Sequence, residues 1–495
     1  MIFLSAQPDD FFFTWQIELQ LFNFIQNGIT NADDIHILVG YNPERGLSSF
    51  FKEVKKKNRN NARFFTYPDN RKSKAYVSSI RPHIINQHFE SFPGLSNENI
   101  FYHDSDILFT ELPDFLKLEN SESWIVSDTK SYIGIDYIIS RTSVQFLEEM
   151  CKIIGIEKQQ IEANNDNAGG AQYFIKNCPK GFWSKVENNS EELFKLLNRY
   201  NQLNKCSDKT IEAWYSDMWS LLWNAWLFKK DVRISEELNF CWTKDSVDEL
   251  RKNKIFHYAG TVDIEDVNYF RKFNYRSFPP YYDLQVLNIS DNNCSSKIKK
   301  TISEFSGMQE KHILQNTTFI FILQNLEDLE DLINSINFIH KNFKTEIVLI
   351  YSGSEEQIDS KYFPLHTKYH RITSEKAGPI FSKKNLEHVS TEFFCFYNHK
   401  YIVSSSDLMK GLNYIFGHKD RCVIPCLKTY HKVDLLLKNL YFKFLNIEVL
   451  RKNKGKCIKR KLRSNPFVIS RTDNFRKFEE FRNIKSMKQT VFGFD

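Results

Sequence analysis

Two aspartates, Asp104 and Asp106, stand between two short apolar segments, Ile100–Tyr102 and Ile107–Phe109. Carboxylates at the end of a buried strand need a compensating charge, which a hard divalent cation such as Mn²⁺ or Mg²⁺ supplies by binding their oxygens. Such an ion can also bind a diphosphate and stabilise the charge on a leaving group. The alternative is a turn in which the aspartates accept hydrogen bonds from backbone amides. The pattern indicates either a metal site or an Asp-capped turn.

The elements around these aspartates predict an α/β fold. A helix with apolar residues three or four positions apart is expected over residues 14–26. Alternation of strand, helix and strand favours a parallel sheet, whose ligand sites lie at the carboxyl ends of the strands. Apolar segments typical of buried strands occupy residues 2–4, 35–39, 100–102, 124–126 and 137–139.

A second α/β domain is expected in the C-terminal part. Residues 279–311 contain a Pro pair and a polar stretch, which is typical of a linker. A strand beginning at Thr318, a helix over residues 327–342, and strands over 346–352 and 393–399 follow. We predict a first domain at residues 1–285, a linker at 286–316 and a second domain at 317–495.

The amino-acid composition limits the classes of protein to which this chain can belong. Lys and Arg number 67 against 61 Asp and Glu, a net charge of +6 that is too dilute to indicate nucleic-acid binding. The 15% aromatic content is typical of a folded chain. The nine cysteines form no CxxC pair, which favours reduced thiols. No segment approaches the roughly 18 apolar residues that span a bilayer, and no signal peptide is evident. We therefore expect a cytoplasmic protein.

A basic run lies near the C-terminus. Residues 451–463 hold eight basic residues and no acidic one. The run is either a solvated loop or a contact with an anionic membrane surface or a phosphate-bearing acceptor. Peripheral attachment of the protein to the inner membrane surface is therefore one of the two alternatives for this run.

Three further sites carry residues that could do chemistry. Asp217 lies in an aromatic, apolar helix, so it must be paired, protonated or functional; the alternatives to a functional role are a helix cap and a salt bridge. Asn167-Ala168-Gly169-Gly170 predicts a loop whose glycines allow backbone to approach a ligand, or an ordinary turn. His257 ends a strand-like segment and could be a third metal ligand or a core histidine.

Short motifs link the chain to a known family. The segment Phe13-Thr14-Trp15-Gln16 follows the first strand, and Arg81-Pro82 opens a segment that ends in Gln87-His88-Phe89-Glu90 shortly before the aspartates. Together with the D-x-D at a strand end, these segments resemble the GT-A glycosyltransferases. They are most similar to the peptidyl hydroxyproline arabinosyltransferase and peptidyl serine galactosyltransferase group. The resemblance covers roughly residues 1 to 275.

The resemblance implies a metal-dependent transfer from a nucleotide-sugar, with UDP the expected nucleotide, to a hydroxyl of a peptide, protein or glycan. It implies retention of the anomeric configuration, with the leaving phosphate helping to take the acceptor proton. Asp217 and Asn167 would contact the acceptor or the sugar. The implied metal ligands are Asp104, Asp106 and His257. The implied donor contacts are Ser5, Ala6, Gln7, Arg81, Asp104, Ser105, Gly169 and Gly170, with Lys74 a weaker candidate.

The second domain resembles a degraded GT-A domain of the processive kind. Ala377-Gly378-Pro379 matches a helix start, but Asn398-His399-Lys400 replaces the acidic motif. An amide and a lysine remove the anionic metal site, so a non-catalytic role in acceptor binding, docking or assembly is expected.

Two other classes compete with the transferase. A non-catalytic carbohydrate- or partner-binding pseudo-enzyme would explain the aromatics, because sugar faces stack on them. It does not explain the two aspartates and His257 together. A nucleic-acid-binding protein is disfavoured by the modest charge and the lack of a recognisable motif.

Overall fold

The computed structural model describes residues 1–205, 209–260, 262, 266–276, 279–282, 284–307, 312–323 and 328–351, residues 389, 391 and 408, and seven short strands between 367 and 471. The chain divides into two compact units, residues 1–272 with 289–301 and residues 273–288 with 302–495. The domain boundaries expected from the sequence stay predictions. In the described part of the chain, no helix has the length and apolar character needed to cross a membrane.

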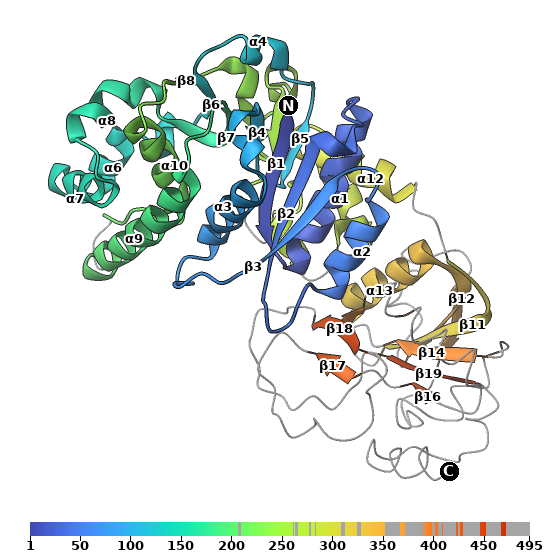
Figure 1. Ribbon diagram of the computed structural model, residues 1–495. Coiled ribbons are helices and arrows are strands. Elements are labelled where there is room, and N and C mark those ends of the chain that lie inside the picture. The colour runs from blue at the N-terminus through green and yellow to red at the C-terminus, as the bar shows by residue number, and fades with distance from the viewer. Residues whose placement is uncertain are drawn as a thin grey trace. The chain divides into compact units, whose positions relative to one another are not determined.

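Seven strands form the main sheet of the first unit, in the order β3-β2-β1-β4-β7-β6-β8 (Figure 1). The first four run parallel, β7 is antiparallel to both of its neighbours, and β8 is parallel to β6. This arrangement confirms the mixed α/β fold with a largely parallel sheet. The strands are β1 (Ile2–Pro8), β2 (Ile35–Tyr41), β3 (Arg63–Pro68), β4 (Ile100–Tyr102), β6 (Trp124–Asp128), β7 (Gly169–Ile175) and β8 (Val232–Ile234).

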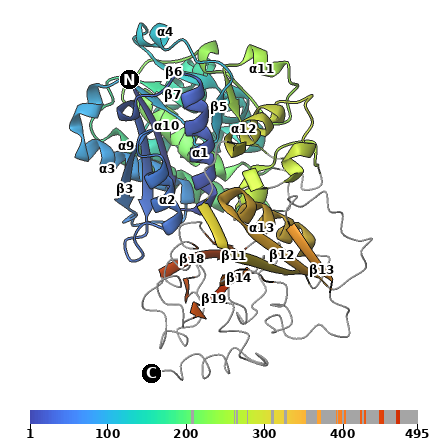
Figure 2. The same ribbon diagram turned by 90° about the vertical axis from the view of Figure 1, so that its right-hand side faces the viewer.

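Helices cover both faces of this sheet (Figures 1 and 2). Successive residues of β1 point to opposite faces. Phe3 accordingly packs in one core cluster with residues of α1 and α2, and Leu4 packs in the other with residues of α3, α9 and α10. The helices are α1 (Phe11–Gln26), α2 (Ser49–Lys57), α3 (Ile80–Ser91), α4 (Phe115–Glu119), α5 (Lys130–Ile133), α6 (Ile135–Arg141), α7 (Val144–Ile154), α8 (Lys158–Asn164), α9 (Phe182–Leu203), α10 (Ser216–Leu227), α11 (Glu249–Lys252) and α12 (Ser295–Gly307).

The first predicted helix is confirmed and begins three residues earlier than expected. The side chain of Asp10 precedes α1 and accepts a hydrogen bond from the amide of Phe12 at 2.8 Å. This cap satisfies one of the amides that lack a partner at a helix start.

A small second sheet brings distant parts of the first unit together. Strand β10 (Ile255–His257) pairs antiparallel with β5 (Ile107–Phe109) and parallel with β9 (Phe240–Cys241). The register places His257 opposite Ile107, the residue that follows the two aspartates.

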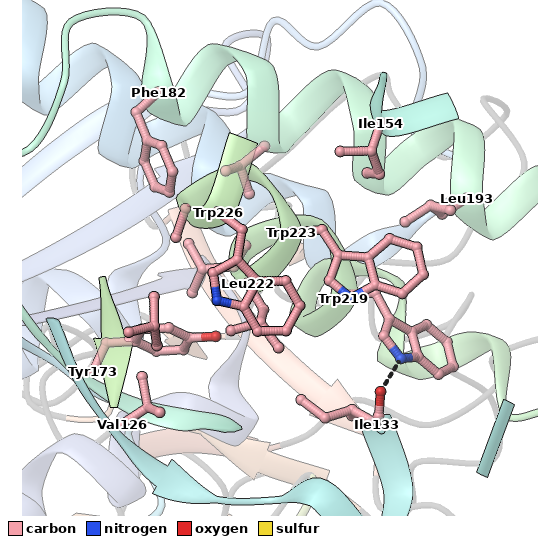
Figure 3. Packing of buried hydrophobic residues seen from close by; sticks show 14 of the residues in the cluster. Val126, Ile133, Ile154, Tyr173, Phe182, Leu193, Trp219, Leu222, Trp223 and Trp226 are labelled. Atoms are coloured by element: carbon pink, nitrogen blue, oxygen red, sulfur yellow. Dashed lines mark hydrogen bonds between the residues drawn. The ribbon is translucent and has the colours of Figure 1, made fainter. Parts of the chain in front are cut away.

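Tryptophans of α10 form the centre of the larger core cluster (Figure 3). Trp219, Trp223 and Trp226 are all buried. The indole Nε1 of Trp219 donates to the carbonyl oxygen of Ile133 at 2.8 Å, which links α10 to α5 (Figure 3). The first turn of α10 is therefore held firmly by its own packing.

One predicted strand is wrong. Residues 137–139 lie in helix α6 instead. Ile135 and Ile138, three positions apart, are the buried residues of that helix. A short apolar segment does not distinguish a strand from a buried helical turn, and here the helical spacing determines the outcome.

The second unit contains a sheet with the order β13-β12-β11-β14-β19-β16. Its strands and helix confirm the elements expected from Thr318 onward, although the first strand begins six residues earlier, at His312. The order matches that of β3-β2-β1-β4-β7-β6, with four parallel strands followed by two antiparallel pairings. The elements are β11 (His312–Leu323), α13 (Leu329–Asn342), β12 (Phe343–Tyr351), β13 (Thr367–Arg371), β14 (Phe393–Tyr397), β16 (Cys422–Val423) and β19 (Phe467–Arg471).

A three-stranded sheet accompanies the main sheet in the second unit as well. Strand β18 (Asn446–Arg451) pairs antiparallel with β15 (Tyr401–Val403) and parallel with β17 (Cys426–Lys428), as β10 does with β5 and β9. The two units thus share one topology. Three features predicted here lie outside the described residues, namely Ala377-Gly378-Pro379, Asn398-His399-Lys400 and the basic run after Arg451.

Candidate metal and diphosphate site

The aspartate turn follows β4 at the carboxyl end of the parallel strands. Neighbouring elements fix its backbone, because Gln20 of α1 donates to the carbonyl oxygen of Asp104 at 2.8 Å and the amide of Tyr258 donates to that of Asp106 at 3.1 Å. Ser105 is buried, with its hydroxyl 3.3 Å from Oε1 of Gln16. The turn is therefore a preformed part of the fold.

The three predicted metal ligands lie together. Nε2 of His257 is 3.3 Å from Oδ1 of Asp106 and 3.8 Å from Oδ2 of Asp104. Each of the three residues offers one ligand atom, and these three atoms all lie within 4.8 Å of one another. Two carboxylates and an imidazole are a suitable donor set for Mn²⁺, and the carboxylates also suit Mg²⁺. The residues present therefore fit a divalent cation.

Two basic side chains contact these carboxylates. Lys272 pairs with Oδ2 of Asp106, and Arg81 of α3 pairs through one terminal nitrogen with Oδ1 of Asp104. The other terminal nitrogen of Arg81 pairs with Asp217. Three carboxylates thus face two basic side chains, so the site can accept a divalent cation together with further anionic groups.

The two aspartates differ in their protonation behaviour. Burial raises the pKa of Asp104 above its ordinary value, and Arg81 offsets part of the increase. Burial acts in the same direction on Asp106, but Lys272 and His257 hold the pKa of Asp106 well below its ordinary value. Asp106 is therefore the permanently ionised carboxylate of the pair.

Asp217 lies in the first turn of α10 and is buried. Its Oδ1 is 2.6 Å from the hydroxyl of Tyr76, and its Oδ2 pairs with Arg81. Asp217 is thus a salt-bridged carboxylate, one of the alternatives open from the sequence. Arg81 joins it directly to Asp104.

The predicted sugar-binding segment is placed differently from expectation. Gly169 and Gly170 begin strand β7 and do not form a loop. A β-carbon on Gly169 would lie 2.3 Å from Cγ2 of Val126, so packing against β6 already requires glycine there. Oδ1 of Asn167 accepts a hydrogen bond from the amide of Ile234 at 3.3 Å. A sugar contact by these residues stays a prediction.

The predicted nucleotide contacts on β1 are buried. The side-chain amide of Gln7 donates to the carbonyl oxygen of Leu38 at 2.6 Å. Oγ of Ser5 and Oε1 of Gln7 are buried and have no hydrogen-bond partner among the residues that the structure describes. Ala6 is buried in the core cluster with α3. Contact of Ser5, Ala6 and Gln7 with a nucleotide stays a prediction.

Lys74 lies apart from the aspartates. Its ammonium is 2.9 Å from the carbonyl oxygen of Asp69 and 3.4 Å from Oδ2 of the same residue. The side chain is half exposed, which fits the reading of Lys74 as ordinary surface charge.

Three residues of the site were missed in the sequence. Lys272 and Tyr76 contact the carboxylates, and the indole of Trp242 stacks on the imidazole of His257 with the ring centroids 5.4 Å apart. These contacts span 166 positions for Lys272 and 141 for Tyr76, so no local pattern marks them. Only the basic character of Lys272, 15 positions after a predicted ligand, was a usable signal.

No family model matches this sequence, and no curated protein does. Among the solved structures that match, three glycosyltransferases show weak likeness. The bifunctional glycosyltransferase WbbM is 13% identical with a TM-score of 0.31, over 61% of this chain and 51% of its own, so this chain spans about half of WbbM. The glycosyltransferase GlyE of Streptococcus pneumoniae TIGR4 is 11% identical with a TM-score of 0.29, over 75% of this chain and 79% of its own. An active-site mutant of LgtC is 13% identical with a TM-score of 0.32, over 62% and 95% respectively. These low scores carry no argument, and the function must be inferred from the site.

Proposed function

We propose that the first domain, residues 1–285, is a metal-dependent GT-A glycosyltransferase. It transfers a hexose or pentose from a nucleotide-sugar, with UDP the expected nucleotide, to an acceptor hydroxyl. The observation that carries this proposal is the meeting of Asp104, Asp106 and His257 within 4.8 Å at the carboxyl end of a parallel sheet. Proteins with an α/β fold bind their ligands at the carboxyl ends of the parallel strands.

The charges of the site support diphosphate chemistry. Asp104, Asp106 and His257 would hold Mn²⁺ or Mg²⁺, which supplies electrostatic stabilisation of a diphosphate leaving group. Arg81 and Lys272 now pair with the carboxylates. A cation on those carboxylates would reduce the pairing and leave both basic groups available to phosphate oxygens. Metal and nucleotide binding should therefore reinforce each other.

The proposed reaction is the transfer that the resemblance to GT-A enzymes implies. The bond between the anomeric carbon and the diphosphate oxygen breaks, and a bond from the acceptor oxygen to that carbon forms. The acceptor proton passes to the released phosphate, and the anomeric configuration is retained. Asp217 would orient the acceptor hydroxyl or the sugar, and Ser105 and the Asn167 to Gly170 segment would line the donor.

The second unit is proposed to be non-catalytic. It has the topology of the first unit, but Asn398-His399-Lys400 stands between β14 and β15, where the first unit has its aspartates between β4 and β5. We expect the second unit to serve acceptor binding, docking or assembly. Its basic run at 451–463 is the candidate for contact with the anionic inner surface of the membrane, which faces the cytoplasm. Asn398→Ala should leave transfer intact.

A thermal shift tests the proposal. Full-length protein is heated with Mn²⁺ and each of UDP, GDP, CDP and ADP, and one pair should raise the midpoint of unfolding because a ligand of the folded state stabilises it. A hydrolysis screen with the corresponding nucleotide-sugars then identifies the sugar. If no pair of metal and nucleotide changes the midpoint, the enzyme proposal is wrong.

A non-catalytic pseudo-enzyme is the second candidate. Its support is that Arg81 and Lys272 pair with Asp104 and Asp106, so two of the carboxylates have basic partners within the protein. A pseudo-enzyme of this kind would respond to free sugars in the thermal shift but to no pair of metal and nucleotide.

A further inference from the structure

Three half-buried aromatic rings follow one another from the imidazole of His257. The indole of Trp242 stacks on His257 at 5.4 Å between centroids and an interplanar angle of 20°. The ring of Tyr132 is 6.3 Å from that of Trp242, and the ring of Tyr215 is 5.2 Å from that of Tyr132. The three rings come from separate segments of the chain and form one continuous row, here called the aromatic row.

The aromatic row lies beside the groups that would do the chemistry. At one end, Trp242 contacts His257, a candidate metal ligand. At the other end, Tyr215 precedes Asp217 by two positions. Burial raises the pKa of the Tyr132 phenol, and the charges of neighbouring Tyr215 and Asp104 add to the increase. The row therefore begins at a candidate metal ligand and ends at the residue that precedes helix α10, whose first turn carries Asp217.

The aromatic row is also held rigidly. Tyr132 belongs to α5, whose residue Ile133 accepts the hydrogen bond from Trp219 (Figure 3). Tyr215 packs edge-on against the same Trp219 at 6.0 Å. Rings fixed in this way lose little conformational entropy when a ligand binds them. A rigid, partly accessible row is what a binding surface requires and what an ordinary surface aromatic lacks.

We propose that the aromatic row binds a sugar ring of the acceptor, so that the acceptor of the proposed transferase is a carbohydrate. This inference rests on the proposed function. A sugar ring offers an apolar C–H face that packs on aromatic rings. The hydroxyl groups at its edge can donate hydrogen bonds to carboxylates such as Asp104 and Asp217. A peptide acceptor would instead need backbone donors and acceptors along an extended groove.

Saturation-transfer NMR on the full-length protein with Mn²⁺ and UDP tests the proposal. The probes are the methyl glycosides of glucose, galactose and N-acetylglucosamine, and a tripeptide that contains serine and hydroxyproline. At least one glycoside should receive saturation at its ring C–H protons. Its affinity should fall roughly three- to tenfold in Tyr132→Leu and in Tyr215→Leu, which keep most of the bulk but lose the ring.

Phe92→Leu is the matched control. Phe92 is a 44% exposed aromatic residue at the end of α3 that precedes β4, whereas the aspartates follow β4. Glycoside affinity should not change in this variant, and an unchanged shift with Mn²⁺ and UDP shows that each variant is folded.

Two kinds of failure are distinguishable. If Mn²⁺ and UDP stabilise the protein but no glycoside receives saturation, or only the tripeptide does, the carbohydrate acceptor is wrong and the proposed function stands. If a glycoside binds but both tyrosine variants retain its affinity, the aromatic row is not where the sugar binds, and the inference is wrong while the proposed function stands. If neither UDP nor GDP, CDP or ADP, each with Mn²⁺, has an effect on the wild-type protein, both proposals are refuted.

Discussion

Nε2 of His257 lies 3.3 Å from Oδ1 of Asp106, although 151 positions separate the two residues in the chain. The antiparallel pairing of β10 with β5 produces this contact, because it sets His257 opposite the residue that follows Asp106. A hydrogen-bonded strand pair is a rigid support for a metal ligand.

Asp106→Asn should abolish metal binding. The amide keeps the size of the side chain but removes the ionised carboxylate that Lys272 and His257 stabilise. Calorimetric titration with Mn²⁺ should show no binding, and transfer should fall on the order of a hundredfold or more. Asp166→Asn is the control, because that side chain is 92% exposed and pairs only with Lys130 among the described ion pairs. Undiminished Mn²⁺ affinity in the Asp106 variant would exclude this residue as a ligand.

Lys272→Met should change the binding of metal and nucleotide in opposite directions. Lys272 competes with a cation for Asp106, so its removal should strengthen the binding of Mn²⁺ alone. The same change removes a basic group from the diphosphate, so UDP should bind more weakly in the presence of Mn²⁺. Both affinities are measured by calorimetry.

The control for that experiment is Lys252→Met, at a 67% exposed lysine of α11 that pairs with Glu249. It should change neither affinity. If Lys272→Met weakens the binding of Mn²⁺ alone, Lys272 stabilises the metal site and does not compete with the ion.

Tyr76→Phe should destabilise the protein and slow transfer. The Tyr76 hydroxyl lies 2.6 Å from Oδ1 of Asp217, and its loss leaves a buried carboxylate oxygen without that partner. The free energy of unfolding, measured with urea, should fall by about 1–3 kcal/mol. The value of kcat should fall more than KM rises, because Asp217 would be less firmly oriented.

Tyr137→Phe is its control, since the hydroxyl of Tyr137 accepts only an exposed hydrogen bond, from the amide of Glu212 at 3.2 Å, among the described contacts. Its unfolding free energy should stay within about 0.5 kcal/mol of the wild-type value. Equal effects of the two substitutions would show that Tyr76 has no special role toward Asp217.

The framework of the site could be predicted from the sequence. The strand before Asp104 and the strand that ends at His257 are short apolar segments next to polar residues, and such boundaries are local features. The grouping of the three ligands came from a resemblance, and the strand pairing supplies its physical cause.

The partners of the site could not be predicted, because they depend on contacts between distant segments. A phosphate contact by Arg81 stays a prediction, and its ion pairs with Asp104 and Asp217 were not expected. Nothing near Tyr76 in the sequence indicates that its hydroxyl meets residue 217. The mistaken strand at 137–139 has a local cause instead, since three apolar residues fit a helix as well as a strand.

The stability of the first unit should depend on the protonation of His88. Burial and the neighbouring His36 lower the pKa of His88 to about 3 from its ordinary 6.5. The folded state therefore favours neutral His88, and the stability that this gives is complete above pH 6.5 and is lost as the pH falls toward 3. The slope from this group approaches about 1.4 kcal/mol per pH unit.

His88→Gln should flatten that dependence, because glutamine does not titrate. Urea unfolding at pH 4 to 7 measures it, and the variant should lose less stability on acidification than the wild-type protein. The side chain of His88 contacts His36 at 3.0 Å and the Tyr67 hydroxyl at 2.7 Å, so a constant loss at all pH values is expected in addition. Parallel curves for the two proteins would show that His88 does not cause the acid sensitivity.

Gly169→Ala should destabilise the first unit whether or not a sugar is present. The added β-carbon would lie 2.3 Å from Cγ2 of Val126 and 2.5 Å from the carbonyl oxygen of Ser127, and backbone cannot yield as a flexible side chain does. Overpacking of this kind costs about 1–3 kcal/mol, which urea unfolding detects. Gly94→Ala is the control, since a β-carbon there meets nothing within 4 Å. If Gly169→Ala left the unfolding free energy unchanged and weakened only the binding of nucleotide-sugar, close approach of a ligand would be the reason for glycine at this position.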